Sequence, residues 1–507
     1  MPTIHDLLQV GADEDVAVSG VDRPLLTYRQ LRLQVSNTVT AIKELGLARN
    51  DRVAMVLPNG PEMAVSFVAF ACCTTTAPLN PAYTYDEFDF YLDDLNARAL
   101  LVLQGADSPA VKAARSRGMQ IIELAFDSTD AAGTFSINSV SAKGVSEPDA
   151  TGLAQPDDVA LVLHTSGTTS RPKIVPLLHE NLCISARNIQ NTLRLEPTDV
   201  CLNVMPLFHI HGLVAAVLAT LSAGGSVFAS PGFNALRFFD WMDHAKPTWY
   251  TAVPTMHQAI LGRAKRNQSI VDRSRLRFIR SASSSLPPQT FAALEDTFGV
   301  PVVEAYAMTE AAHQMTCNQL PPGLRKPGTV GCPAGPEVAI MHESEARILA
   351  VGDVGEIVIR GENVTPGYEN NPDANASSFV NGWFRTGDQG VMDADGFLRI
   401  TGRLKEIINR GGEKISPREV DEVLMDHPAV QQVVTFAIPH KSLGEEVAAA
   451  IVLHENMNAT ESDIRSYAAE RLAAFKVPHN IVFIDEIPKG PTGKLQRIGL
   501  AEMLGIV

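Results

Sequence analysis

The stretch "LVLHTSGTTSRPK" at residues 161–173 decides the fold, because an apolar run passes directly into a loop of small hydroxyl residues. The preceding run "VALVLH" predicts a buried strand that ends where the loop begins. Successive small residues let backbone amides and hydroxyl groups converge on an anion. Since α/β folds bind ligands at the C-terminal ends of their strands, we expect an α/β protein with a phosphate-binding loop here.

The loop comes close to the Walker sequence but departs from it at two positions. Lys173 stands six residues after Gly167, as the Walker lysine stands after its first glycine. Pro172 replaces the second glycine, and Ile174 stands where a serine or threonine would hold magnesium. We therefore predict a phosphate-binding loop that is not a Walker loop. A flexible serine-rich linker is the alternative, and the strand-like flanks and the Pro-Lys end count against it.

Length and charge bound the class of protein. A chain of 507 residues should form more than one domain, and 45% hydrophobic with 20% charged residues is an ordinary globular composition. A net charge of −15 counts against a nucleic-acid partner. One local basic run, residues 263–280, carries seven arginines and lysines. We interpret it as a solvated helix face, with a landing place for an anionic ligand as the alternative.

Cysteine usage and the chain ends predict a cytoplasmic enzyme. The six cysteines show no CxxC spacing, which favours free thiols in a reducing compartment over disulfides or a zinc site. The first eighteen residues lack the features of a signal peptide, and the longest apolar stretch, near residues 213–223, is short of a membrane span. The last three residues, Gly-Ile-Val, are not the peroxisomal tripeptide, so peroxisomal residence would need a partner. The sequence leaves monomer and homodimer open.

The chain alternates strand and helix patterns up to about residue 335. Examples are "DRVAMVLPNG" before "PEMAVSFVAFA", "WYTAVP" before "TMHQAILGRAKR" and "LRFIRSAS" before "PPQTFAALEDTFG". Such alternation predicts an α/β body with a largely parallel sheet. Short strands with glycine turns then indicate a β subdomain. We place a small α+β C-terminal domain at 403–507, after an N-terminal domain at 1–402, and a boundary without a flexible linker favours a hinge.

Four further segments supply polar groups that the loop lacks. "EAYAMTE" ends in Thr309, whose hydroxyl can contact phosphate, and Glu310, whose carboxylate can ligate Mg²⁺. "WFRTGD" brings Asp388, an acid suited to vicinal ribose hydroxyls, and Arg403 follows in "GRLKEIINRGGEKISP". "PKGPTGKLQR" presents Lys494 on a glycine-rich loop. Each motif alone is weak, and their ordered occurrence over more than 300 residues is the strong signal.

Together these motifs resemble the adenylate-forming superfamily of acyl-CoA synthetases, peptide-synthetase adenylation domains and firefly luciferase. The resemblance runs from "LTYRQL" at 26–31 to "TGKLQR" at 492–497. It implies that a carboxylate and ATP with Mg²⁺ give an acyl-adenylate and pyrophosphate. Attack by the thiol of coenzyme A then gives an acyl-CoA and AMP. The small C-terminal domain is expected to swing between the two half-reactions.

The same resemblance implies roles for the residues at the matching positions. It assigns the triphosphate to Thr165, Ser166, Gly167, Thr168, Thr169 and Lys173. It implies that Thr309 contacts the α-phosphate, that Glu310 binds the magnesium ion, and that Asp388 and Arg403 hold the ribose, with Tyr306 also in the nucleotide site.

The C-terminal residues receive their roles in the same way. Lys405 matches the hinge, and Gly411 and Gly412 match the backbone that meets the pantetheine arm. Lys494 would bridge the carboxylate and the α-phosphate and stabilise the charge that develops as the acid attacks phosphorus. Its loss should abolish adenylation more than thioester formation.

The acid is expected to be short, polar and anionic. Members of the superfamily that take fatty or aromatic acids carry Ser-Gly-Ala-Ala-Pro-Leu where this chain reads "SASSSL" at 281–286. Hydroxyl groups buried against a hydrocarbon chain would cost about 1–3 kcal/mol each if unpaired. We predict that Ser283 and His313 contact the distal carboxylate, with His209 at the mouth of the pocket. His257 is a further candidate donor, although a structural histidine is the simpler interpretation.

One branch of the superfamily is especially similar. "RSASSSL", "VVEAYAMTEAAHQMT", "RKPGTVG" and "RGENVTPGY" resemble the oxalate–CoA ligases of plants and fungi. That branch implies oxalate as the acid and oxalyl-CoA as the product. The familiar pattern near residue 281 is Ser-Cys-Ser-Ala-Ser, so Ala282 and Ser284 depart from it, whereas Ser283 and Ser285 keep their places.

Several alternatives remain open at this point. The first is a general medium-chain or 4-coumarate-like acyl-CoA ligase with a larger apolar pocket. A carrier-loading adenylation domain lacks support because no carrier sequence follows Lys494. A luciferase-like oxygenase needs only the adenylation half. A regulatory nucleotide-binding protein is disfavoured by the intact Glu310, Asp388, Arg403 and Lys494.

Overall fold

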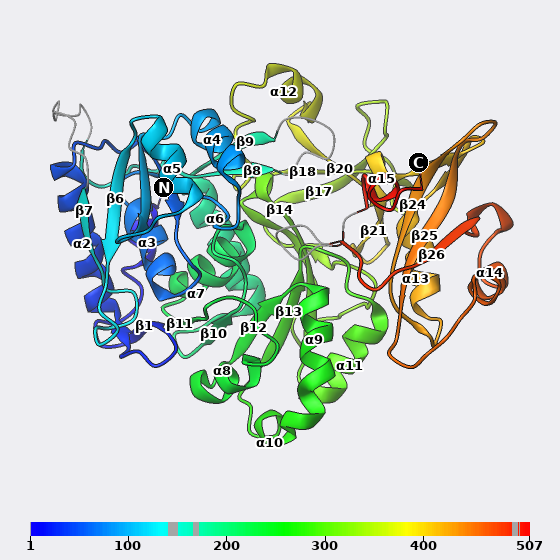
Figure 1. Ribbon diagram of the computed structural model, residues 1–507, viewed down its shortest axis with the longest axis horizontal. Coiled ribbons are helices and arrows are strands. Elements are labelled where there is room, and N and C mark those ends of the chain that lie inside the picture. The colour runs from blue at the N-terminus through cyan, green and yellow to red at the C-terminus, as the bar shows by residue number, and fades with distance from the viewer. Residues whose placement is uncertain (1, 140–150, 166–171, 489–494, 496, 507) are drawn as a thin grey trace.

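The computed structural model describes residues 2–139, 151–165, 172–488, 495 and 497–506. Two wide sheets and a smaller third one form a large N-terminal body, and a fourth sheet belongs to a C-terminal domain at its edge (Figure 1). The expected α/β class with a β subdomain and a small α+β domain is confirmed. No helix among the described residues combines the length and the apolar character that crossing a membrane requires.

The first sheet has seven strands in the order β7-β6-β5-β3-β4-β8-β9. It is parallel except for its two edge strands, β7 and β9. The strands are β3 (Arg52–Val56), β4 (Thr75–Pro78), β5 (Ala99–Leu103), β6 (Gln120–Ala125), β7 (Ser136–Ser139), β8 (Val159–Thr165) and β9 (Lys173–Leu178). Their apolar runs are buried on both faces, as parallel sheets require.

The second sheet has nine strands in the order β16-β15-β14-β13-β12-β10-β11-β1-β2. Its six central strands are parallel, and β2, β15 and β16 pair antiparallel at the edges. The strands are β1 (Val16–Ser19), β2 (Leu26–Thr27), β10 (Val200–Asn203), β11 (Ser226–Ala229), β12 (Trp249–Ala252), β13 (Phe278–Ala282), β14 (Val302–Met308), β15 (His313–Cys317) and β16 (Cys332–Pro333).

Helices that are apolar on all sides lie between these two sheets. They are α3 (Pro61–Ala71), the π-helix η1 (His211–Leu218) and α7 (Ala219–Ser222), and every residue in them except Glu62 is buried. Helices η1 and α7 pack with α6 (His179–Leu193), and α3 packs with η1. A helix without a polar face has to be buried in this way. The largest hydrophobic core therefore lies between the sheets.

Amphipathic helices cover the outer faces. The first sheet is covered by α4 (Tyr85–Asp94) and α5 (Pro109–Ser116), and the second by α8 (Phe238–Ala245), α9 (Pro254–Ala264) and α11 (Pro288–Phe298). Helix α2 (Tyr28–Glu44) packs on α3, and Thr27 caps its N-terminus in a capping box with Gln30, as its sequence predicts. Shorter helices described in these two layers are α1 (Ile4–Leu7), η2 (Lys265–Asn267), α10 (Gln268–Val271) and η3 (Thr309–Ala311).

The third sheet is antiparallel throughout and is the expected β subdomain. It contains β17 (Glu337–Met341), β18 (Val354–Arg360), β19 (Phe379–Val380), β20 (Trp383–Met392) and β21 (Leu398–Arg403), with α12 (Pro372–Ser378) beside it. Because β21 ends at Arg403, the body reaches the residue at which we placed the boundary.

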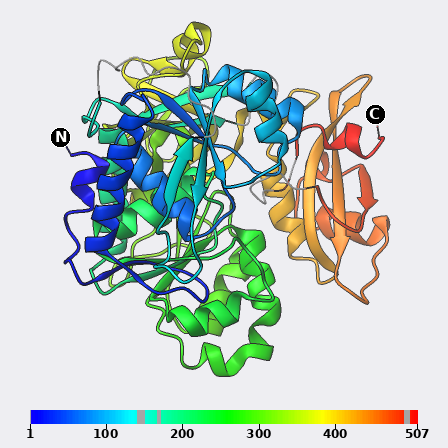
Figure 2. The ribbon, with the colours of Figure 1, turned by 60° about the vertical axis from the view of Figure 1, so that its left-hand side comes forward.

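The C-terminal domain begins after the short helix η4 (Leu404–Glu406) and lies apart from the body in a second view (Figure 2). Its elements are β22 (Ile408–Arg410), β23 (Glu413–Ile415), α13 (Pro417–Met425), β24 (Val430–His440), β25 (Gly444–Leu453), α14 (Glu461–Ala469), η5 (Ala474–Lys476), β26 (Asn480–Phe483) and α15 (Leu500–Met503). The Ser416 hydroxyl donates to the carbonyl of Thr401 across the boundary. That this domain swings remains a prediction.

The basic run at 263–280 is not a single solvated helix face. Arg273 does form a surface ion pair with Asp243, and the exposed Arg277 pairs with the buried Asp199. Arg280, however, is fully buried on β13, so our interpretation is wrong for this residue. A strand in the middle of a covered sheet buries residues on both of its faces, which a charge count along the sequence does not reveal. All six cysteines are free, as expected.

Candidate active site

The predicted phosphate loop connects two antiparallel strands. Thr165 ends β8 and stands opposite Lys173, the first residue of β9. A Walker loop instead joins a strand to a helix, so the topology agrees with a phosphate loop of another kind. Both residues are half-buried. The other predicted loop residues, Ser166, Gly167, Thr168 and Thr169, lie outside the described residues.

A tyrosine connects the loop lysine with the predicted magnesium ligand. The Nζ atom of Lys173 lies 4.2 Å from the ring centroid of Tyr368. The Tyr368 hydroxyl donates a 2.8 Å hydrogen bond to Oε1 of Glu310, whose carboxylate is almost fully buried. Burial raises the pKa of Glu310. Sequence reasoning gave Tyr368 no role, although it stands in the quoted segment "RGENVTPGY".

The segment that carries Tyr368 also fixes the backbone around Glu310. The Thr365 N–H donates to the carbonyl of Glu310, and the Thr365 hydroxyl donates to the carbonyl of Pro176 on β9. Strand β9 and Glu310 are therefore held in one unit. Thr309, the first residue of η3, is half-buried next to it.

Three predicted nucleotide residues meet in the middle of β20, opposite the end of β21. Asp388 and Arg403 are direct partners in the pairing of β20 with β21, and Nε of Arg403 lies 3.1 Å from Oδ1 of Asp388. The Tyr306 hydroxyl donates to Oδ2 of the same carboxylate. Asp388 is thus oriented from two sides, while 44% of the Arg403 side chain stays exposed.

The predicted hinge lysine, Lys405, lies in the short helix that precedes the C-terminal domain. Lys405 is exposed in η4. Burial lowers the pKa of Lys173, and the charge of Lys405 contributes in the same direction. Gly411 and Gly412 occupy the exposed turn between β22 and β23, at φ of +62° and +98°. Lys494 lies outside the described residues.

The predicted acid pocket contains a histidine that we had not singled out. Nδ1 of His211 lies 3.0 Å from the hydroxyl of Ser283, and its ring centroid lies 5.2 Å from that of His313. His209 is half-buried two residues earlier, and its Nδ1 accepts a hydrogen bond from the His211 N–H. The structure thus brings Ser283 and His313 together around His211. Whether His209 or His211 points toward Ser283 depends on the conformation of the turn before η1, and the sequence does not reveal that conformation.

Two of these residues have unusual backbone conformations. Ser283 has φ of +75° and His313 has φ of +108°. Residues other than glycine avoid this region at a cost of about 1–3 kcal/mol, and such strain is concentrated at functional sites. Helix η1, which begins at His211, is a π-helix, another feature enriched at functional sites.

The other candidate donors do not all belong to this site. Ser284 is exposed, and Ser281 is buried on β13. His257 is fully buried on α9 and lies 3.4 Å from the Tyr250 hydroxyl, which agrees with a structural histidine. Burial lowers its pKa to about 4, so it is neutral.

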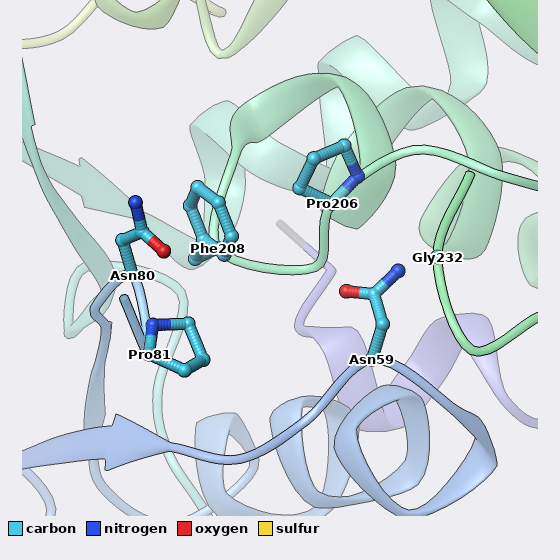
Figure 3. Close-up of a pocket in the computed structure, with 6 residues that line it drawn as sticks. All are labelled: Asn59, Asn80, Pro81, Pro206, Phe208 and Gly232. Atoms are coloured by element: carbon cyan, nitrogen blue, oxygen red, sulfur yellow. The ribbon is translucent and has the colours of Figure 1, made fainter. Parts of the chain in front are cut away.

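A pocket of about 310 Å³ borders the turn that carries His209 (Figure 3). Pro206 and Phe208 line it together with Asn59, Asn80, Pro81 and Gly232. The Asn59 amide also donates to the carbonyl of Met205 and accepts from the N–H of Leu207, so it fixes this turn. No charged side chain is among its lining residues.

Comparison with known proteins identifies the family. The profile of AMP-binding enzymes matches residues 10–369, and the profile of the AMP-binding enzyme C-terminal domain matches residues 419–494. The oxalate–CoA ligase of Saccharomyces cerevisiae is 43% identical, covering 99% of this chain and 96% of the relative. The oxalate–CoA ligase of Arabidopsis thaliana is 45% identical over 93% and 92% of the two chains. The sulfoacetate–CoA ligase of Cupriavidus necator is 35% identical over 94% and 92%.

Solved structures agree with these relatives. ATP-bound MatB from Rhodopseudomonas palustris superposes with a TM-score of 0.88 at 29% identity, over 99% of this chain and 98% of that one. Apo MatB from the same organism gives 0.78. The curated relatives are named as CoA ligases, so the expected ligase class is confirmed. This chain belongs to the AMP-binding enzyme family.

Proposed function

We propose that this protein is an oxalate–CoA ligase, which converts oxalate, ATP and coenzyme A into oxalyl-CoA, AMP and pyrophosphate through oxalyl-adenylate. The observation that carries the proposal is the polar group of Ser283, His211 and His313 in the place of an acyl pocket. The identity to two oxalate–CoA ligases over nearly the whole chain supports it.

The pocket chemistry suits a small dianion and not a hydrocarbon chain. Ser283 and His313 offer hydrogen-bond donors on either side of the His211 ring. A distal carboxylate would accept from them, whereas an alkyl or phenyl group would leave them unpaired. We assign Ser283 and His313 to the distal carboxylate and His209 to the mouth of the pocket.

Asp388, Tyr306 and Arg403 suit the ribose of ATP. A carboxylate accepts hydrogen bonds from two vicinal hydroxyl groups, and it is already oriented by Tyr306 and Arg403. We assign the triphosphate to Lys173 and to Thr165, Ser166, Gly167, Thr168 and Thr169. We assign Thr309 to the α-phosphate.

Glu310 fits a magnesium ion. Mg²⁺ is usually held by one or two carboxylates together with substrate phosphates, and it prefers oxygen ligands. Among the described residues no group of three or more His, Cys, Asp or Glu side chains could hold a metal alone, which agrees with a cation shared with ATP. When bound, Mg²⁺ neutralises charge on the phosphates. The Tyr368 hydroxyl donates to Glu310, and Lys173 lies over the ring of the same tyrosine.

The first half-reaction joins the acid to AMP. One oxalate oxygen attacks the α-phosphorus of ATP, the bond to the bridging oxygen breaks, and pyrophosphate leaves. We assign Lys494 to the charge that develops between carboxylate and α-phosphate. The thiol of coenzyme A then attacks the acyl carbonyl, loses its proton and expels AMP. Gly411 and Gly412 are assigned to the pantetheine arm in this second step, with Lys405 at the hinge between the two states.

The described arrangement of the two domains supports an adenylating state. The chain superposes better on ATP-bound MatB than on apo MatB, although both comparisons cover 99% of this chain.

An acid panel tests the proposal. ATP–pyrophosphate exchange is measured with oxalate, malonate, sulfoacetate, acetate, 4-coumarate and octanoate, and the product with coenzyme A is identified by mass. We expect the highest kcat/KM with oxalate. Preference for 4-coumarate or octanoate would establish the alternative, a general acyl-CoA ligase. A His313→Ala variant should raise the KM for oxalate or lower kcat, and an unchanged enzyme would remove His313 from the site.

A further inference from the structure

Arg280 is a buried cation that has no role in the proposed mechanism described so far. It is fully buried on β13, and among the described residues no carboxylate forms an ion pair with it. Its NH1 group donates to the Thr251 hydroxyl at 3.4 Å, and its NH2 group donates to Oε1 of Gln314 at 3.3 Å. Arginine stays charged in proteins, and an unpaired buried charge is costly, so its presence requires a reason.

A chain of hydrogen bonds leads from Arg280 to the acid pocket. Oγ1 of Thr251 on β12 lies 2.6 Å from Nε2 of His211, and Nδ1 of His211 lies 3.0 Å from Oγ of Ser283. Thr251 and His211 are both fully buried, whereas Ser283 is only half-buried. The chain therefore runs from the core of the second sheet to the residue that we place against the distal carboxylate.

The donors in this chain all point the same way. A guanidinium can only donate, so the Thr251 oxygen accepts from Arg280. The same oxygen could also accept from a protonated Nε2 of His211, but the Thr251 proton would then lack an acceptor among the side-chain contacts of the described residues, so we infer that Thr251 donates and Nε2 accepts. A neutral imidazole that accepts at Nε2 carries its proton on Nδ1 and donates it to Ser283. The Ser283 oxygen accepts, and its own proton is left to point into the pocket.

We propose that Arg280, Thr251 and His211 are positioning residues that fix Ser283 as a hydrogen-bond donor toward an anionic acid. The inference deepens the proposed function, because it names the device that makes this pocket selective for a negatively charged distal group. Hydrogen bonds in such a chain polarise one another, and the arginine at its start favours negative charge at its end. The anion of the substrate supplies the negative charge that Arg280 lacks in the protein.

Thr251→Val tests the relay without removing the buried charge. Valine has nearly the same shape but no hydroxyl, so His211 loses the donor that holds its tautomer. We expect the KM for oxalate to rise about 10- to 100-fold, as for the loss of a hydrogen bond to a charged group, with the KM for ATP unchanged. Thr251→Ser keeps the hydroxyl and should restore the wild-type value. Thr38→Val, which removes a buried threonine hydroxyl bonded within α2, is the matched control.

The tautomer of His211 is a second measurable quantity, and it should not change if Thr251 has only a structural role. Selective ¹⁵N labelling of histidine, with His211→Gln to assign the signal, should show Nδ1 protonated in the wild-type enzyme and a shift toward Nε2 protonation in Thr251→Val. This measurement needs no substrate and can be made on the wild-type enzyme even if the valine variant does not fold. Nε2 protonation in the wild type, or an unchanged acid KM in a folded Thr251→Val enzyme, would overturn the proposal.

The outcomes separate this inference from the proposed function. If the enzyme prefers another small dianion, the effect of Thr251→Val on KM is measured with that acid. An increase in that KM would support the positioning role of Arg280, Thr251 and His211, although oxalate would no longer be the proposed substrate. If the acid is apolar, Thr251→Val should leave its KM unchanged, and both proposals fail. A charge-conserving Arg280→Lys variant should lose less affinity for the dianion than Arg280→Met, and equal losses would exclude a role for the charge.

Discussion

Asp388 and Arg403 stand directly opposite each other on β20 and β21, and their side chains form an ion pair of 3.1 Å. Fifteen positions separate them in sequence, yet the antiparallel pairing makes them neighbours without any contribution from the rest of the fold. The Tyr306 hydroxyl reaches the same carboxylate from β14 in the second sheet. The carboxylate therefore joins the second and third sheets, which makes its orientation sensitive to both.

Replacement of Asp388 by asparagine should weaken ATP binding. The variant keeps the shape of the side chain but loses the charge that pairs with Arg403 and one acceptor for a ribose hydroxyl. We expect the KM for ATP in pyrophosphate exchange to rise about 10- to 100-fold, with a smaller change in the KM for the acid. Glu337→Gln, which breaks an exposed ion pair with Arg360 in the same sheet, is the control and should leave both values unchanged. A larger effect on the acid than on ATP would contradict the ribose assignment.

Glu310→Gln should raise the magnesium requirement. An amide is a poorer ligand for a hard divalent cation than a carboxylate, although the Tyr368 hydroxyl can still donate to it. We expect the magnesium concentration at half-maximal exchange to rise about tenfold or more and the rate to recover partly at high magnesium. Asp388→Asn serves as a control in the same titration, since it should change the KM for ATP and not the metal requirement. An unaltered magnesium curve would remove Glu310 from the metal site.

Ser283 offers a way to separate strain from function. Its φ of +75° is unfavourable for any residue with a side chain except in special contexts, and glycine adopts it freely. Ser283→Ala and Ser283→Gly both remove the hydroxyl, so both should raise the KM for the acid to a similar extent. The glycine variant should be more stable than the alanine variant, by about 1 kcal/mol in the free energy of unfolding. Thermal unfolding and the KM for the acid are measured for both variants. A glycine variant that keeps the wild-type KM would show that the Ser283 hydroxyl does not contact the acid.

Much of the geometry of the proposed nucleotide site was predictable because each motif lies within one local structure. "WFRTGD" and the glycine-arginine that ends β21 form one hairpin, so Asp388 and Arg403 had to meet once both strands were recognised. Thr165 and Lys173 flank one loop in the same way. The family resemblance then supplied the connection between these segments, which spacing alone does not give.

The acid pocket was predicted less completely, because it is assembled from side chains whose direction depends on tertiary packing. His209 and His211 stand two residues apart, and the π-helix start selects His211 to face Ser283. Arg280 was counted with a run of surface cations, although it belongs to a strand covered on both sides. Tyr368 comes from a segment almost sixty residues after Glu310, and no periodic pattern links the two.

A second buried acid predicts how stability should depend on pH. Glu304 on β14 lies behind the pocket strand, and its Oε1 accepts a 3.1 Å hydrogen bond from the N–H of Leu286. Burial raises its pKa to about 7, while Arg418 and Glu422 of α13 exert smaller opposing effects. Between the ordinary pKa near 4.5 and this raised pKa, the unfolded chain ionises but the folded protein keeps the proton.

The sign of the effect follows from that difference in bound protons. The folded state binds more protons at Glu304 than the unfolded state in this window, so the contribution of Glu304 to the free energy of unfolding should fall as pH rises from 4.5 to 7 and be constant above it. A raised carboxyl pKa of this size corresponds to a loss of at most about 3 kcal/mol. Glu304 therefore destabilises the folded protein more at neutral pH than at acidic pH. A salt-bridged carboxylate has the opposite pH dependence, because its contribution to stability is lost as pH falls.

Glu304→Gln isolates this term, because glutamine is neutral at every pH and every other titrating group is shared with the wild-type enzyme. We expect the melting temperature of the variant relative to that of the wild type to rise between pH 5 and pH 8. Any cost of placing the amide beside Leu286 is the same at both pH values and cancels in this comparison. A melting-temperature difference that stays constant across the window would mean that Glu304 titrates at its ordinary pKa in the folded enzyme. Polar groups other than the N–H of Leu286 would then have to compensate for the desolvation of its carboxylate.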